Sequence, residues 1–281
     1  MKSLRIALLA LGLTLTCQPA AARPGAGPDD EKVRISDLRL ARTPDAAQGS
    51  VIFPEDTREL FVSFAYAGGT SEPVTFIVIG PGGVEAARLT GRYRGDGTAT
   101  LKISGADMLR RLSQALDEAV RAGQANARDA AAQAVGPREY LLTTQYHVHR
   151  AIQTLDLLNH AQLGPDLDPP LRLVGDRLSV LSALVGDALR LPPDEIQAMR
   201  AAAQKMSAPF AQAVGASGSV VTGATPVKDA VLPSTGTDAR RAYTLNVEIS
   251  GDPSNSLEFW VQRTTKLYLP NTRLRHVEPG R

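Results

Sequence analysis

The chain has 281 residues, with 31 lysines and arginines, 29 aspartates and glutamates, and one cysteine. The near-balance of charge excludes the basic field that nucleic-acid binding requires, and one cysteine excludes a disulfide framework within the chain. The length suits one large domain or two small ones.

Residues 1–22 have the features of a bacterial export signal. Lys2 and Arg5 form a basic start, and residues 6–15 are almost wholly apolar but too short to span a bilayer. Removal of this segment would leave 29 basic and 29 acidic residues and no run long enough for a transmembrane helix. We therefore expect a periplasmic or secreted protein.

The signal cleavage site is predicted from small side chains. Ala20 and Ala22 occupy the two positions that a signal peptidase reads. Cys17 offers the alternative of a lipid anchor, but Thr14 and Thr16 stand where lipidated signals have leucine and a small residue. Cleavage after Ala22 is therefore favoured, and the mature chain would then have no cysteine for a disulfide, a metal site or a nucleophile.

Residues 32–105 are predicted to form the first part of an antiparallel β-sandwich, after a flexible lead-in at 23–31. Apolar and polar residues alternate at 60–66, which predicts a half-buried strand. The nearly continuous apolar run at 74–79 predicts a strand that is buried on both faces. Asp96-Gly97 predicts a hairpin turn. Short strands separated by Gly-rich turns are typical of a sandwich.

Residues 106–214 change to helical periodicity, with apolar residues three and four apart. This segment predicts an insert of about four helices, of which the second, third and fourth begin near Pro137, Pro169 and Pro192. Pro209 is expected to disrupt the fourth helix. Amphipathic helices joined by short loops should pack as an antiparallel bundle, and the Ala-rich first helix is expected to be its most mobile part.

Residues 215–241 are rich in Gly, Ser, Thr and Pro and are predicted to be a linker, with a short strand at 219–222. Residues 242–270 alternate strongly and predict a closing hairpin. A two-stranded hairpin alone is marginally stable in water, so its inward face needs the N-terminal strands as a partner. We therefore expect Leu245 to lie close to Val78, with the helices looped out between them.

The strand segments resemble secreted bacterial immunoglobulin-like domains. The resemblance rests on residues 53–57 before the strand 60–64, and on 243–245 leading to 258–261. It implies an α+β chain, built as an immunoglobulin-like antiparallel β-sandwich that is interrupted by an inserted antiparallel helical bundle. The Cys–Trp–Cys core of antibody domains is absent. A resemblance at the level of the fold implies no function.

Trp260 is the candidate partner-binding residue. It falls on the outward face of the closing hairpin, between Glu258 and Gln262, where an exposed aromatic side chain could stack on a sugar or a partner protein. The favoured alternative is that the helical insert or the tail covers it. The tail at 271–281 is basic and could touch an anionic surface, although a solvated tail is favoured.

Three short motifs have simpler explanations. Arg94-Gly95-Asp96 is a receptor-binding tripeptide, but its Asp-Gly also suits a tight turn. Leu232-Pro233-Ser234-Thr235-Gly236 matches the sortase pentapeptide, but no hydrophobic segment and basic tail follow, so a linker is favoured. His147 and His149 would point to different faces of a helix, and neither these nor His160 has a carboxylate at a metal-ligand offset.

The residues give no catalytic or cofactor signature. Residues 215–218 resemble a nucleophile elbow only imperfectly, and they lie in the predicted linker. Glu55 and Asp56 are adjacent, so a strand would send their carboxylates to opposite faces, which does not suit paired acid–base chemistry. We find no phosphate-binding or dinucleotide motif and expect no cofactor and no metal.

These observations favour an exported, non-catalytic binding or structural module of the cell envelope. The sandwich would be the scaffold, and the helical insert would contact a protein or glycan partner. One alternative is a sensory bundle with a small molecule in its core. Another is an unrecognised hydrolase of wall or extracellular polymers.

Overall fold

The computed structural model describes most of the chain between the predicted signal and the predicted tail. The described residues are 32–132, 136–161, 163, 165–235 and 242–262. Several predictions lie outside them: the cleavage residues Ala20 and Ala22, the alternative anchor Cys17, the lead-in at 23–31, the end of the linker at 236–241, the end of the hairpin segment at 263–270 and the tail at 271–281.

The chain has an α+β fold, which confirms the predicted class. In the described residues, N-terminal strands alone form one sheet, and strands from both ends of the chain form the other. The α-helices all fall between the sixth and seventh strands. The strands are β1 (Arg34–Ala41), β2 (Ile52–Pro54), β3 (Glu59–Ala67), β4 (Thr70–Gly80), β5 (Val84–Arg94), β6 (Gly97–Ser104), β7 (Tyr243–Ile249) and β8 (Asp252–Gln262), and the 3-10 turn η1 (Pro81–Gly83) joins β4 to β5. The helices are α1 (Gly105–Ala132), α2 (Pro137–Asn159), α3 (Asp168–Arg190), α4 (Ile196–Lys205) and α5 (Ser207–Ala224).

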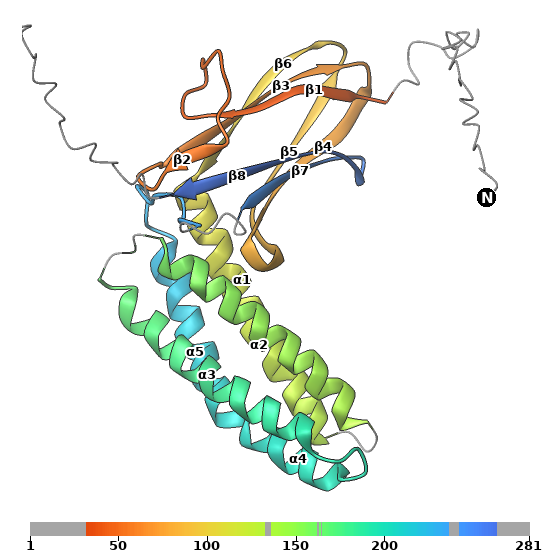
Figure 1. Ribbon diagram of the computed structural model, residues 1–281, viewed down its shortest axis with the longest axis vertical. Coiled ribbons are helices and arrows are strands. Elements are labelled where there is room, and N and C mark those ends of the chain that lie inside the picture. The colour runs from red at the N-terminus through yellow and green to blue at the C-terminus, as the bar shows by residue number, and fades with distance from the viewer. Residues whose placement is uncertain (1–31, 133–135, 162, 164, 236–241, 263–281) are drawn as a thin grey trace, which may run out of the picture.

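The two sheets face each other (Figure 1). One has the strand order β1-β3-β6 and the other β2-β8-β7-β4-β5. The rings of Phe64 in β3 and Phe76 in β4 are 4.8 Å apart between centroids, and Tyr93 in β5 meets Phe64 edge-on at 5.3 Å. Aromatic pairs of this kind contribute about 0.5–1.5 kcal/mol beyond the area that they bury. The sheets therefore share a core, and that core is continuous with the core of the helices.

The closing strands join the N-terminal strands, as the marginal stability of a lone hairpin required. β7 pairs with β4 in antiparallel register, with Leu245 opposite Val78, and β8 pairs with β7. β2 then adds to the edge of β8 in parallel, with Ile52 opposite Trp260. This pairing confirms that the helices are looped out of a sheet to which both ends of the described chain contribute.

The predicted hairpin at Asp96-Gly97 is wrong. β5 pairs with β4, whereas β6 pairs with β3, so the chain crosses from one sheet to the other at this turn. The Asp96 carboxylate accepts a hydrogen bond of 3.0 Å from the backbone N–H of Gly68, and this contact ties the crossing to the loop after β3. An Asp-Gly pair favours a tight turn, but the turn alone does not decide which strands pair.

The helical region, defined as α1 to α5, extends away from the sheets (Figure 1). α1 packs against α2, α4 and α5, and α3 packs against α2, α4 and α5. α1 begins directly after β6 with a capping arrangement in which Ser104 Oγ accepts the Asp107 N–H at 3.1 Å and donates to Asp107 Oδ2 at 2.7 Å. The strand–helix junction is thus closed by local hydrogen bonds.

The predicted linker at 215–241 is wrong in its first part. Residues 215–224 belong to α5, which packs on α1 and α3, so the strand expected at 219–222 is also wrong. The buried residues of α5 recur at helical spacing, and most of them are small enough to allow close packing. Pro209 is the third residue of this helix, a first-turn position where a missing N–H costs no hydrogen bond within α5. α4 ends at Lys205, four residues before Pro209, so the helical chain is interrupted between α4 and α5 as predicted.

The segment after α5 is anchored between the sheets and the helices. The Leu232 N–H donates to the Thr57 carbonyl oxygen at 2.7 Å, and the Thr235 N–H donates to the Val261 carbonyl oxygen at 2.8 Å. The Tyr243 hydroxyl donates to the Pro233 carbonyl oxygen at 2.9 Å. Hydrogen bonds to three separate segments fix this part of the chain, which therefore connects the helical region rigidly to the sheets.

Candidate functional site

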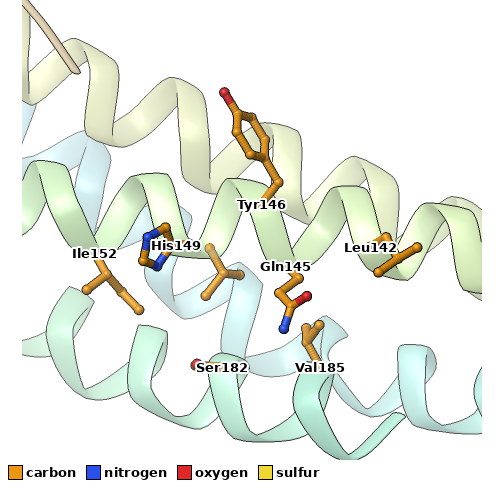
Figure 2. A pocket seen from close by; sticks show the side chains of 8 residues that line it. Leu142, Gln145, Tyr146, His149, Ile152, Ser182 and Val185 are labelled. Carbon is orange, nitrogen blue, oxygen red and sulfur yellow. The ribbon is translucent and has the colours of Figure 1, made fainter. Parts of the chain in front are cut away.

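A groove lies between α2 and α3 of the helical region, with a volume of about 330 Å³. The groove is open to solvent and combines apolar with polar side chains. Its lining residues are Leu142, Gln145, Tyr146, Val148, His149 and Ile152 of α2 and Ser182 and Val185 of α3. Figure 2 shows Gln145 and Ile152 pointing toward α3, where Ser182 and Val185 lie, and Tyr146 pointing away from α3.

The α2 helix carries apolar residues on two faces. One stripe, which includes Leu141, Val148 and Leu155, is buried in the helical core. The other contains Leu142 and Tyr146, four residues apart and so on one face of the helix, and these side chains are 50% and 57% exposed. Single exposed apolar residues are common, but two neighbours on the rim of a groove suit a surface that a partner covers.

Polar groups beside the rim are arranged along α2. Nε2 of His149 and Nε2 of Gln153 are 2.9 Å apart, and Arg150 donates from Nη1 to the Tyr146 hydroxyl oxygen at 3.2 Å. The Tyr146 and His147 rings meet edge-on at 5.3 Å. Burial, assisted by the nearby charge of Arg150, lowers the pKa of His147 below its ordinary value. The uncharged form of His147 is therefore favoured at neutral pH.

The three histidines considered as metal ligands do not come together. His147 is half-buried, His149 lines the α2–α3 groove, and His160 lies at the end of α2 with its Nε2 3.8 Å from Asp156 Oδ1. The expectation that His160 has no carboxylate at a ligand offset is therefore wrong, because Asp156 lies four residues before it on the same face of the helix. Within the part of the chain that the structure describes, no cluster of three His, Cys, Asp or Glu residues has a metal-binding arrangement.

Trp260 is half-buried on the five-stranded sheet, across from Ile52. Its backbone N–H donates to the Val51 carbonyl oxygen at 2.8 Å. Ile52 is 59% exposed, so this corner of the sheet offers a second apolar surface. The sequence identified the aromatic residue but not Ile52, because the parallel pairing of β2 with β8 brings them together from distant parts of the chain.

The short motifs have different positions in the fold. Arg94-Gly95-Asp96 is exposed at the crossing between the sheets. In contrast, Leu232 and Thr235 of the sortase-like pentapeptide are fully buried. Asp56 pairs loosely with Arg42, at 3.8 Å.

Ser217, the centre of the imperfect nucleophile-elbow match, is buried within α5. Its hydroxyl donates to Asp117 Oδ1 at 2.7 Å, and Oδ2 of the same carboxylate accepts from Arg121 Nε at 2.6 Å. A serine in the middle of a helix, with its hydroxyl bonded to a carboxylate between two helices, has a packing role and not the exposed position of a nucleophile.

A half-buried ion-pair network connects β5 to α1. The Glu85 carboxylate accepts hydrogen bonds from Arg88 at 2.8 Å and from Arg111 at 3.3 Å, and Arg111 also reaches Glu118 at 3.2 Å. The Arg88 hydrogen bond, opposed by burial and supported by the charges of both arginines, lowers the pKa of Glu85. The carboxylates and guanidinium groups of this network pair with one another, so the network has a structural role in linking β5 to α1.

Sequence reasoning missed the α2–α3 groove. The spacing of Leu142 and Tyr146 was a usable signal, because it marks a second apolar stripe on a helix whose first stripe already faces a core.

Among the described residues, no helix combines the length and the apolarity needed to cross a membrane. Comparison of the chain with protein-family models, with curated proteins and with solved structures finds no match.

Proposed function

We propose that the protein is an exported, non-catalytic binding module of the cell envelope. In this proposal an immunoglobulin-like β-sandwich is the scaffold, and an antiparallel helical bundle carries the recognition surface. The observation that carries the proposal is the α2–α3 groove with Leu142 and Tyr146 exposed on its rim. Export rests on the predicted signal segment and its cleavage residues Ala20 and Ala22.

The partner is a protein segment that presents an apolar side chain to the groove. Apolar and aromatic side chains that a partner covers supply most of the binding energy of an interface, and polar groups orient the partner. Leu142 and Tyr146 supply the first kind of contact, and Gln145, His149 and Ser182 supply the second. The helices that carry the groove extend away from the sheets (Figure 1).

The packing of the helical core favours this surface over a small molecule inside the bundle. Met108, Leu112 and Leu116 of α1 are fully buried and fill the space between the helices. The carboxylates of Asp117 and Glu85 are both hydrogen-bonded to neighbouring side chains in structural roles. A binding function therefore accounts for the exposed features better than a hydrolase does.

The test compares matched truncations of exposed apolar side chains. The purified protein, the double variant Leu142→Ala/Tyr146→Ala and the control Ile52→Ala are immobilised and exposed to an envelope fraction of the source organism. Captured proteins are identified by mass spectrometry, and the dissociation constant of each is then measured with the purified partner. We expect the double variant to weaken binding by about tenfold or more, because each truncation of a central contact costs 1 kcal/mol or more, while Ile52→Ala binds as the unchanged protein does.

Equal binding by all three proteins would contradict the proposed role of the groove. Loss of binding in Ile52→Ala or Trp260→Ala alone would move the recognition surface to the corner of the five-stranded sheet.

A further inference from the structure

A second groove lies on the other side of α3, between α3 and α5. It is open to solvent along both helices, and its volume is about 590 Å³. Its lining residues are Pro169, Pro170, Leu173 and Arg177 of α3 and Gln212, Gly215, Ala216 and Ser219 of α5. The sequence pattern predicted a linker for most of the α5 residues. The groove exists because that segment is helical and packs beside α3.

Arg177 is the one ionisable residue among those that line the groove. Within the described residues, its guanidinium has neither a hydrogen bond nor an ion pair, and its Nε is buried without a partner. Arg190 on the same helix, by comparison, pairs with Asp187 at 3.0 Å. A cation that is partly removed from water and has no partner favours the approach of an anion, because the anion restores the hydrogen bonds that burial removed.

The rest of the groove is suited to an apolar group. Leu173 lies one helical turn before Arg177, on the same face of α3, and is 39% exposed. Gly215 and Ala216 are small residues across from it, and a Cβ atom added at Gly215 would meet no atom within 4 Å. The groove thus offers an apolar wall, open space beside small residues, and one cation.

We propose that the α3–α5 groove binds an acidic segment of a partner protein. An aspartate or glutamate carboxylate of that segment accepts hydrogen bonds from Arg177, and a neighbouring apolar side chain packs against Leu173 above Gly215. A peptide segment suits the groove better than a small molecule, because small-molecule sites enclose most of their ligand, whereas this groove is open along two helices. The inference rests on the proposed binding function and adds the chemistry of the partner.

The test selects peptides from a random library displayed on phage, using the full chain as bait. Selected peptides are synthesised, and their dissociation constants are measured by fluorescence anisotropy. We expect the selected sequences to carry Asp or Glu next to Leu, Ile or Phe. Arg177→Gln should weaken binding by about tenfold or more, since a hydrogen bond to a charged group is lost. Arg172→Gln, which removes an exposed arginine of the same helix outside the groove, should leave binding unchanged.

A double-mutant cycle makes the assignment specific. Replacement of the peptide's acid by its amide should weaken binding to the unchanged protein by the same factor, and should have no further effect on Arg177→Gln. The peptide substitution needs no protein variant, so the inference stays testable even if Arg177→Gln is unstable. Selected peptides without an acid, or equal losses in Arg172→Gln and Arg177→Gln, would overturn the inference.

The outcomes separate this inference from the proposed function. If Leu142→Ala/Tyr146→Ala loses its envelope partner while Arg177→Gln binds all selected peptides normally, the binding function stands and the acidic-segment inference fails. If neither set of variants changes any binding, both fail.

Discussion

The junction between the sheets and the helical region depends on a glycine. Gly105 is the first residue of α1 and follows β6 directly, and its N–H donates to the Arg58 carbonyl oxygen at 2.7 Å. A methyl group at this position would overlap the carbonyl oxygen of Ala230 and lie 2.6 Å from the carbonyl carbon of Val231. Carbon atoms pack best at about 3.5–4.0 Å, so Gly105→Ala requires the backbone to move.

The cost of that movement follows from how both sides are held. The segment at 230–231 cannot withdraw easily, because the next residue, Leu232, donates to the Thr57 carbonyl oxygen at 2.7 Å. Overpacking a core costs about 1–3 kcal/mol, and a contact between two backbone segments lies at the upper end of that range. The better helix propensity of alanine returns at most about 1 kcal/mol. We expect Gly105→Ala to lower the free energy of unfolding by about 2 kcal/mol, and the melting temperature by about 4–8 °C for a chain of this length.

Gly186→Ala is the matched control. Gly186 lies inside α3, and a side chain there would meet no atom within 4 Å, so the substitution should raise the free energy of unfolding by about 0.5–1 kcal/mol. Urea unfolding followed by far-ultraviolet circular dichroism measures both variants. A Gly105→Ala protein as stable as the unchanged one would show that the 230–231 segment can move, and would refute a rigid junction between sheets and helices.

Two further predictions concern the same junction. Tyr243→Phe removes the hydrogen bond to the buried Pro233 carbonyl oxygen and should lower the free energy of unfolding by about 1–3 kcal/mol; an unchanged urea midpoint would contradict this. Ser104→Ala removes the cap of α1 and should cost about 1 kcal/mol at neutral pH. The Ser104 hydroxyl, with Arg110, lowers the pKa of Asp107, so this stabilisation is present above the ordinary carboxyl pKa and is lost as the pH falls through the lowered one. The difference between Ser104→Ala and the unchanged protein should therefore shrink in acid, and an equal difference at all pH values would argue against the carboxylate's part in the cap.

Strong local periodicity was enough to predict most of the elements. Alternation at Tyr243–Ile249 matches a strand whose odd-numbered residues are all buried. The apolar residues of α1 and α3 that recur three and four apart are the ones that face the helical core. These patterns succeed because the backbone period of a strand or a helix decides which side chains share a face.

The errors occurred where local preference and tertiary packing disagree. The Gly- and Ser-rich composition of residues 215–224 disfavours a helix in isolation, but α1 and α3 offer a surface on which small residues pack closely, and burial outweighs propensity. Asp96-Gly97 does form a turn, but the two strands it joins belong to different sheets.

The sequence alone determined the α+β class, the succession of a strand-rich, a helix-rich and a second strand-rich part of the chain, and the core face of the strongly periodic elements. Only the tertiary structure decided that α5 is a helix and which side chains of α2 remain exposed. It also decided that Arg177 lies, without a hydrogen-bond partner for its Nε, beside small residues of α5. The physical reason is that periodicity is a property of one segment, whereas exposure and pairing depend on which distant segments pack beside it. The surfaces that carry the proposed function are of this second kind.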